Sequence, residues 1–246
     1  MARPKTGGIW ETVKTVVYAV LIALGIRTFF YEPFNIPSGS MIPTLLVGDY
    51  LFVSKFSYGY SRHSLPLSLN LFSGRVFASE PKRGDVAVFK LPRDGQTDYI
   101  KRIVGLPGDR VQMRKGVFYL NDEAVPRRQM DGFTGASPSG ASHPLPQFIE
   151  SLPGGREFRI LKLVEDGSLD DTPVFVVPQG HYFALGDNRD NSLDSRAAGG
   201  VGFIPAENLI GRAEFLFFST NGAAHIWEFW NWPKAIRFER LLDAVE

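Results

Sequence analysis

The only long apolar run lies near the amino terminus, at residues 15–26, and reads Thr-Val-Val-Tyr-Ala-Val-Leu-Ile-Ala-Leu-Gly-Ile. Its uncharged part is short for a bilayer core, which needs about 20 apolar residues. It becomes long enough if Lys14 and Arg27 extend their charged ends towards opposite interfaces, with Trp10 and residues 29–31 at headgroup depth. We therefore expect a transmembrane anchor over residues 9–31.

A cleaved secretory signal peptide is the alternative for this run, since such a peptide also has a basic start and a short apolar core. The residues after the core, Arg27 to Pro33, are bulky and charged and offer no small-x-small cleavage site. An uncleaved anchor is therefore favoured. Arg3, Lys5 and Lys14 outweigh Arg27, so residues 1–8 are expected to stay in the cytoplasm.

From residue 49 onwards, short runs of aromatic and β-branched residues alternate with turn-forming clusters, a pattern typical of strands. The expected strands cover residues 50–56, 85–89, 98–104, 111–114, 117–120, 158–164, 173–177 and 209–218. Lys115 and Gly116 lie between two of these runs and predict a hairpin turn. Residues 60–80 and 131–156, rich in Ser, Pro or Gly, are expected to form loops.

This order of runs predicts a mainly β fold in which one transmembrane helix precedes an antiparallel β catalytic domain with a smaller inserted β lobe. The catalytic domain is expected over residues 32–109 and 179–223, and the lobe over 110–178. With 246 residues the chain can bury a substantial core. Its 17 prolines, 25 glycines and 20 phenylalanines favour short strands and turns over a helical bundle.

The tail, residues 224–246, has a different pattern. Aromatic residues crowd together before Pro233, and further apolar residues then recur at roughly helical spacing. The two groups are Trp227, Phe229, Trp230 and Trp232, then Ile236, Phe238, Leu241, Leu242 and Val245. Such aromatics most often belong to a core or to a seam between lobes, which is our first expectation. A membrane-interface anchor is the alternative, because Trp favours headgroup depth.

The composition excludes several kinds of chemistry. Lys and Arg together number 27 against 26 Asp and Glu, so no broad nucleic-acid-binding face is expected. The absence of cysteine removes disulfides and thiol chemistry. The four histidines are scattered, and neither a zinc-hydrolase motif nor a phosphate loop occurs. Residues 186–196 resemble a calcium loop at first sight, but Arg189 stands where a ligand would be needed. We expect no metal and no cofactor.

Candidate chemistry begins directly after the apolar run, in residues 31–44. This segment contains Ser38 and Ser40 among prolines and a glycine, so it is a poor helix and an interrupted strand. Prolines bias their neighbours towards extended conformations, and the expected result is a stiff, extended segment that presents both serines at fixed angles. The alternative is a linker between membrane and domain that merely contains serines.

A serine in a chain with no obvious histidine partner needs another base, and lysine can serve if its amine is neutral. Lys101 lies within an apolar strand pattern, on the face opposite to Arg102. One of these two cations is therefore expected to press against apolar neighbours. Burial without a carboxylate partner lowers the pKa of a lysine. The alternative is that both residues are edge-strand cations that face solvent, and spacing alone favours that alternative.

Four segments together resemble type I bacterial signal peptidase, and they occur in the order of that family after a membrane anchor. Residues 37–44 (Pro-Ser-Gly-Ser-Met-Ile-Pro-Thr) resemble its nucleophile segment, and residues 99–109 (Tyr-Ile-Lys-Arg-Ile-Val-Gly-Leu-Pro-Gly-Asp) resemble its general-base segment. Residues 81–86 and residues 186–196 (Gly-Asp-Asn-Arg-Asp-Asn-Ser-Leu-Asp-Ser-Arg) resemble two further segments. The resemblance spans roughly residues 27–218, and four segments in order are highly specific.

The resemblance implies a role for each matching residue. Ser40 would be the nucleophile, Lys101 the general base and Ser192 the residue that orients the Lys101 amine. The Ser38 hydroxyl and the Ser40 N–H would form the oxyanion hole. The remaining residues would support the site or form shallow apolar pockets for small side chains. The supporting residues are Asp187, Asp194 and Arg196, and the pocket residues are Phe34, Ile36, Met41, Leu45, Tyr99 and Ile100.

It also implies a membrane-anchored serine endopeptidase that removes signal peptides from exported preproteins after Ala-x-Ala-like ends. Its partners would be these preproteins, the phospholipid membrane and, by proximity, the export machinery. The catalytic domain would lie on the outer, periplasmic face of the bacterial inner membrane. Some relatives carry two membrane segments and a disulfide in the second lobe. In this chain we expect one membrane segment, and there is no cysteine.

Two other functions compete with this one. The first is a self-cleaving regulatory Ser/Lys protein, which predicts a DNA-binding helical domain in front of the β fold. The second is a non-catalytic, membrane-tethered β binding module, which predicts no labelling of Ser40 by a serine-reactive acylator.

Overall fold

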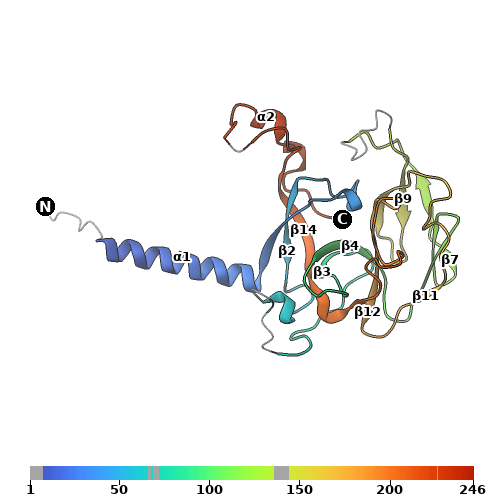
Figure 1. Ribbon diagram of the computed structural model, residues 1–246, viewed down its shortest axis with the longest axis horizontal. Helices are drawn as coiled ribbons and strands as arrows, with labels where there is room; N and C mark the ends of the chain where they lie inside the picture. The colour runs from blue at the N-terminus through green and yellow to red at the C-terminus, as the bar shows by residue number, and fades with distance from the viewer. Residues whose placement is uncertain (1–7, 66–67, 69–71, 136–143, 226) are drawn as a thin grey trace.

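The computed structural model describes residues 8–65, 68, 72–135, 144–225 and 227–246, and shows one projecting helix attached to a β-sheet body (Figure 1). The predicted cytoplasmic segment 1–8 lies outside the described residues except for Gly8. Parts of the loops predicted over 60–80 and 131–156 also lie outside them.

Helix α1 (Ile9–Phe29) is long and apolar enough to cross a membrane, and none of its residues is buried against the body. It projects away from the sheets in Figure 1. The helix ends at Phe29, two residues before the expected anchor does, because β1 (Tyr31–Asn35) begins at Tyr31 and pairs with β2 (Asp49–Ser54). The last residue of the predicted anchor thus belongs to the body.

The main sheet of the described chain has seven strands, and all of its neighbouring strands are antiparallel. In spatial order they are β1, β2, β14 (Leu209–Ser219), β3 (Val86–Lys90), β4 (Asp98–Gly105), β12 (His181–Leu185) and β13 (Ile204–Pro205). The strand predictions around residues 50, 85, 98 and 209 are thereby confirmed.

The described residues between β4 and β12 form two smaller sheets. One contains β11 (Phe175–Val176), β5 (Arg110–Arg114), β6 (Val117–Leu120) and β7 (Glu123–Ala124), and the other contains β10 (Glu157–Leu161), β9 (Gln147–Ser151) and β8 (Arg127–Gln129). Because β4 and β12 are neighbours in the main sheet, these seven strands form an insertion between them. The mainly antiparallel β fold is therefore as the sequence predicts, while the domain boundaries stay a prediction.

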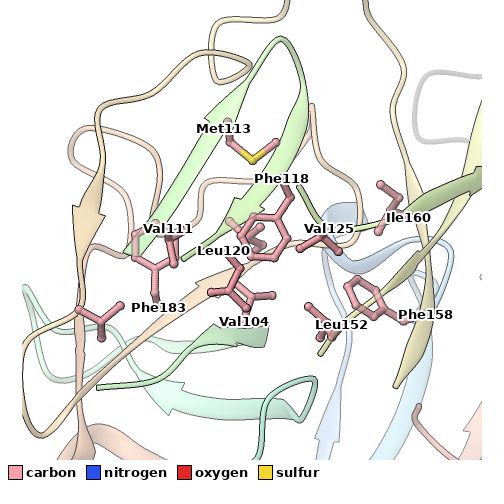
Figure 2. Packing of buried hydrophobic residues seen from close by; sticks show 12 residues of the cluster. Val104, Val111, Met113, Phe118, Leu120, Val125, Leu152, Phe158, Ile160 and Phe183 are labelled. Atoms are coloured by element: carbon pink, nitrogen blue, oxygen red, sulfur yellow. The ribbon is translucent and has the colours of Figure 1, made fainter. Parts of the chain in front are cut away.

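The inserted strands share one hydrophobic core with the main sheet. Figure 2 shows Phe118 and Leu120 of β6 packed with Val104 of β4 and Phe183 of β12. All four side chains are buried. The lobe thus packs directly against β4, the strand that carries Lys101, and against its neighbour β12. Burial of these apolar side chains stabilises the part of the sheet that carries the candidate base.

The hairpin predicted at Lys115 and Gly116 is confirmed between β5 and β6. Both central residues have positive φ, 46° and 70°. This geometry fits the right-handed twist of a two-residue hairpin, and glycine at the second position adopts it without steric cost.

The loop predicted over 131–156 is wrong for residues 147–151, which form β9. Its residues, Gln-Phe-Ile-Glu-Ser, pair with β8 on one side and β10 on the other. Proline and glycine on both sides made the segment look like a loop, whereas the pairing partners that make it a central strand are set by the tertiary fold.

The helical spacing seen after residue 236 does not produce a helix. Among the described residues of the tail, only Trp232–Ala235 (α2) and a 3-10 turn at Phe238–Arg240 are helical. The chain instead runs beside β14, where Leu242 N donates to Leu216 O at 2.8 Å and Val245 N to Glu214 O at 2.8 Å. These backbone bonds to the sheet replace those that a helix would make.

The expectation that the tail aromatics form a core or a seam is also wrong. The exposed fractions are 66% for Trp227, 68% for Phe229, 63% for Trp230 and 41% for Trp232. Figure 1 shows the segment around α2 projecting from the body. We call residues 227–232 the aromatic tip.

Candidate active site

The loop from Ile36 to Asp49 carries the candidate nucleophile. Its base is closed by Ile36 N donating to Asp49 O at 2.8 Å and by Gly48 N donating to Ile36 O at 3.0 Å. Met41 and Leu45 are fully buried in the core beneath it. Burial of these side chains turns the chain inwards, so Ser40 lies in a 3-10 turn, Gly39–Met41. The expected extended conformation holds for β1 and for Ser38, whose φ is -128° and ψ 154°, but not for Ser40.

Lys101 comes from β4 and reaches this turn from the neighbouring part of the sheet. Its Nζ lies 2.7 Å from Ser40 Oγ and donates to the carbonyl oxygen of Ile100 at 2.8 Å. Lys101 is only 3% exposed and Ser40 is also buried. The structure therefore brings together the two residues expected to form the dyad, at hydrogen-bond distance.

Burial lowers the pKa of Lys101 from 10.5 to about 8, although Asp194 and Asp187 oppose this change by attracting the positive charge. Neither carboxylate is free to pair with the amine. Asp187 accepts two hydrogen bonds from Arg102, at 2.9 and 2.7 Å. Asp194 accepts two from the Arg196 side chain, at 2.9 and 2.7 Å. A neutral Lys101 is thus accessible near neutral pH.

The structure buries both cations of the strand, whereas the sequence pattern had predicted one. Arg102 is fully buried, paired with Asp187 and stacked over the Phe158 ring at 4.3 Å. The reason is that β4 is covered on both faces, by the nucleophile loop and by the inserted lobe. Successive side chains of such a strand point to opposite faces, and here both faces are buried. Alternation therefore does not distinguish a buried side chain from a solvent-exposed one.

The loop over residues 186–196 is held by its own charged side chains. Asp194 accepts the Gly186 N–H at 3.0 Å, and Arg196 donates to the Arg189 carbonyl oxygen at 2.6 Å. Arg189 in turn forms a buried bidentate ion pair with Glu150 of β9. The inserted lobe thereby fixes the loop, and sequence reasoning missed Glu150 because it lies in the segment expected to be a loop.

Ser192 lies in this loop, buried close to Gly186. A Cβ placed on Gly186 would come 2.1 Å from Ser192 Oγ and 2.6 Å from the Ser40 carbonyl oxygen, so the contact requires glycine. Within the described residues Ser192 Oγ has no hydrogen-bond partner. Its orientation of Lys101 therefore stays a prediction.

A second hydroxyl lies beside the nucleophile. Ser38 Oγ is 3.5 Å from Ser40 Oγ. Ser40 is the second residue of the 3-10 turn, where N–H groups have no acceptor within the turn. Both donors expected for an oxyanion hole are thus next to the Ser40 hydroxyl.

An apolar cleft of about 400 Å³ opens at Ser40 and Lys101. Of the six residues expected to form pockets, four line it: Phe34, Ile36, Tyr99 and Ile100. Met41 and Leu45 do not, because they are fully buried below it. The cleft also contains residues that the sequence analysis did not single out, among them Asn35, Val88, Asp98 and Leu193. Asn35 and Asp98 directly adjoin the expected pocket residues Phe34 and Tyr99 in the sequence, but strict strand alternation places them on the opposite face from these two, so the sequence pattern did not indicate them. No signal pointed to Leu193.

Comparison with known proteins gives a family and close relatives. The family model described as signal peptidase, peptidase S26, matches residues 9–218. Signal peptidase I of Rickettsia typhi is 46% identical over 222 residues, which cover 85% of this chain and 82% of that protein. Signal peptidase I of Rickettsia canadensis is 45% identical over 215 residues, covering 84% and 79%.

Among solved structures, a signal peptidase I from Enterococcus faecalis V583 is similar to this chain. The identity is 27%, the match covers 55% of this chain and 97% of that one, and the TM-score is 0.32.

Proposed function

The chain belongs to the signal peptidase family, peptidase S26, whose members are serine endopeptidases, and from this premise we propose that it removes signal peptides with a Ser40–Lys101 dyad. The observation that carries the proposal is the buried Lys101 amine, which lies 2.7 Å from the Ser40 hydroxyl while the nearby carboxylates are paired with arginines. Serine is a weak nucleophile until a base takes its proton, and a neutral amine can take it.

In the acylation step, Ser40 Oγ attacks the scissile carbonyl carbon of the preprotein while its proton passes to Lys101 Nζ. The carbonyl oxygen becomes an oxyanion that accepts hydrogen bonds from Ser38 Oγ and Ser40 N–H. The C–N bond then breaks, and the leaving amine takes the proton from Lys101. The products of this step are the mature protein and an acyl-enzyme at Ser40.

Deacylation uses the same two residues, with Lys101 now activating water and Ser40 acting as the leaving group. Neutral Lys101 takes a proton from water, and the resulting hydroxide attacks the ester carbon at Ser40. The ester bond breaks and the proton returns from Lys101 to the Ser40 oxygen, which frees the signal peptide as a carboxylic acid. Arg102 cannot replace Lys101, since a guanidinium keeps its proton at any working pH.

The cleft supports a preference for small side chains at the first and third positions before the cut. Its lining includes Ser40 and the apolar or aromatic side chains of Phe34, Ile36, Tyr99 and Ile100. Shallow apolar pockets of this kind admit alanine and exclude bulky or charged side chains. We therefore propose Ala-x-Ala-like ends as the cleavage sites.

We propose that α1 anchors the enzyme in the bacterial inner membrane, with the amino terminus in the cytoplasm and the body on the periplasmic face. The apolar, unburied helix supports the anchor, and the excess of basic residues before it supports the orientation. Confinement of enzyme and preprotein to one membrane face raises their effective concentration. The same anchor places the enzyme in the membrane that holds the export machinery.

The test is cleavage of a preprotein by the full chain in detergent. We expect turnover by the wild type and none above background by Ser40→Ala and Lys101→Ala. Normal turnover by either variant would refute the dyad. A serine-reactive acylator should label the wild type and not Ser40→Ala; absence of labelling in the wild type would favour a non-catalytic binding module.

A further inference from the structure

Asn188 touches the nucleophile turn from the loop over residues 186–196. Its backbone N–H donates to the Ser40 carbonyl oxygen at 3.1 Å, and its side-chain Nδ2 donates to the Gly39 carbonyl oxygen at 2.9 Å. Asn188 is 1% exposed. A carbonyl oxygen only accepts hydrogen bonds, so the amide nitrogen and not the amide oxygen of Asn188 must face the turn.

The bond to Gly39 determines where the Ser40 N–H points. A trans peptide unit is planar, and its C=O and N–H point in opposite directions. The carbonyl of Gly39 and the N–H of Ser40 belong to the same unit, so holding this carbonyl towards Asn188 turns the N–H away from Asn188. The other donor to the carbonyl, Ile42 N, is longer at 3.3 Å. Asn188 therefore makes the shorter of the two bonds that set this peptide plane.

We propose that Asn188 is a positioning residue that aims the Ser40 N–H at the oxyanion. The inference rests on the proposed function, because it requires Ser40 to be the nucleophile. Asn188 touches neither the substrate nor the reacting atoms. It acts through the Gly39–Ser40 peptide unit, and its effect appears only when negative charge develops on the carbonyl oxygen.

The alternative is that Asn188 only stabilises the fold, as a buried asparagine elsewhere in the chain does. Asn208 is a matched control, since it is also buried and its Nδ2 donates to the Lys90 carbonyl oxygen at 2.9 Å. Asn208→Ala removes the same kind of bond without touching the Gly39–Ser40 peptide unit. It measures what the loss of such a bond costs when no oxyanion is involved.

The experiment compares two inhibitors that end in Ala-Leu-Ala, a peptide aldehyde and the corresponding alcohol. With the aldehyde, Ser40 Oγ forms a bond to the carbonyl carbon, the hydroxyl proton passes to Lys101 and the carbonyl electron pair moves onto the oxygen. This adduct needs the oxyanion hole, whereas the alcohol binds without forming it. The ratio of the two inhibition constants thus reports on the oxyanion hole and not on peptide binding.

We expect Asn188→Ala to weaken the aldehyde about 10- to 100-fold, and to lower kcat by a similar factor, because a misdirected oxyanion donor is largely lost. The alcohol and KM should change less than about twofold. Asn208→Ala should leave both inhibitors and kcat at wild-type values. Asn188→Ser also removes the amide donor but keeps a polar side chain. If Asn188→Ala does not fold, Asn188→Ser is compared with the wild type by the same two inhibitors.

Two results separate failure of this inference from failure of the proposed function. If the wild type prefers the aldehyde but Asn188→Ala keeps that preference, or weakens both inhibitors equally, the positioning role is overturned and the dyad stands. If the wild type binds aldehyde and alcohol alike, and Ser40→Ala changes nothing, the serine nucleophile itself is refuted.

Discussion

At the residue scale, the proposed role of Lys101 as the general base makes its pKa the quantity that sets the pH dependence of cleavage. Burial lowers it to about 8, and only the neutral amine accepts the serine proton. We expect kcat/KM to rise with pH through an acid limb near 8 and then to level off. The measurement is a pH–rate profile of preprotein cleavage between pH 6 and 11. A limb near 10.5 would mean that the amine is solvated and would contradict the mechanism.

The same buried amine should destabilise the folded protein. Below pH 8 the amine is protonated in both states, so the folded state carries a buried charge. Between pH 8 and 10.5 the unfolded chain binds more protons, and stability rises with pH. Each pKa unit is worth about 1.4 kcal/mol, so Lys101→Met should raise the free energy of unfolding by up to about 3 kcal/mol at pH 7.

This gain should shrink as the pH approaches 10.5, which unfolding measurements at pH 7 and pH 10 would detect. The exposed Lys82→Met is the control and should change stability little at either pH. A gain for Lys101→Met that does not vary with pH would come from packing and would contradict the pKa assignment.

Ser38 should contribute to the rate and not to binding. Its hydroxyl lies 3.5 Å from Ser40 Oγ, where a second oxyanion donor is expected. Removal of one such donor typically costs about 10²–10³ in kcat, so Ser38→Ala should retain slow turnover with little change in KM. Steady-state kinetics on a preprotein would show this. Complete loss of acylation would instead indicate that Ser38 shapes the nucleophile turn.

At the element scale, the ion pair between Glu150 of β9 and Arg189 joins the inserted lobe to the loop that carries Ser192. Both side chains are 1% exposed. Removing one partner leaves a buried charge uncompensated, so Glu150→Ala should destabilise the protein by about 3–5 kcal/mol. Thermal or denaturant unfolding would measure this loss.

The matched control is Arg128→Ala in the neighbouring strand β8. Arg128 is 62% exposed and its pair with Glu157 is 3.7 Å long. Exposed pairs contribute about 0–1 kcal/mol, so this variant should stay close to the wild type. Equal effects of the two variants would mean that the buried pair does not tie the lobe to the loop.

At the scale of the whole molecule, we expect the aromatic tip to lie in the membrane interface. Figure 1 shows the segment around α2 projecting upwards from the same end of the body that α1 leaves to the left. Trp227 and Trp230 are largely exposed and Trp232 is partly exposed, and tryptophan prefers headgroup depth. This would give the body a second contact with the lipid besides α1.

Quenching by brominated lipids tests this contact on the full chain in nanodiscs. The variant Trp10→Phe leaves only the tryptophans of the tip. Lipids brominated near the headgroup should quench the fluorescence of these tryptophans strongly. Soluble acrylamide should quench it less than it quenches free tryptophan in buffer. Fluorescence that brominated lipids do not change would place the tip in water.

Local sequence determined much of the architecture. Runs of β-branched and aromatic residues set most strands within a few residues, and Lys115-Gly116 set its hairpin, because these preferences depend on neighbouring residues alone. The apolar run set α1 for the same reason. The spacing of the serines and Lys101 relative to these strands, together with the family resemblance, was enough to name the residues that the structure brings together.

Tertiary structure alone decided the environments of those residues. Only the covering of β4 on both faces buries Lys101 and Arg102 together, and only the partners on either side make residues 147–151 a strand. The tail follows β14 because the sheet offers it backbone partners that local spacing does not reveal. Burial, and with it the pKa of Lys101, depends on segments distant in the chain, so no local pattern could supply it.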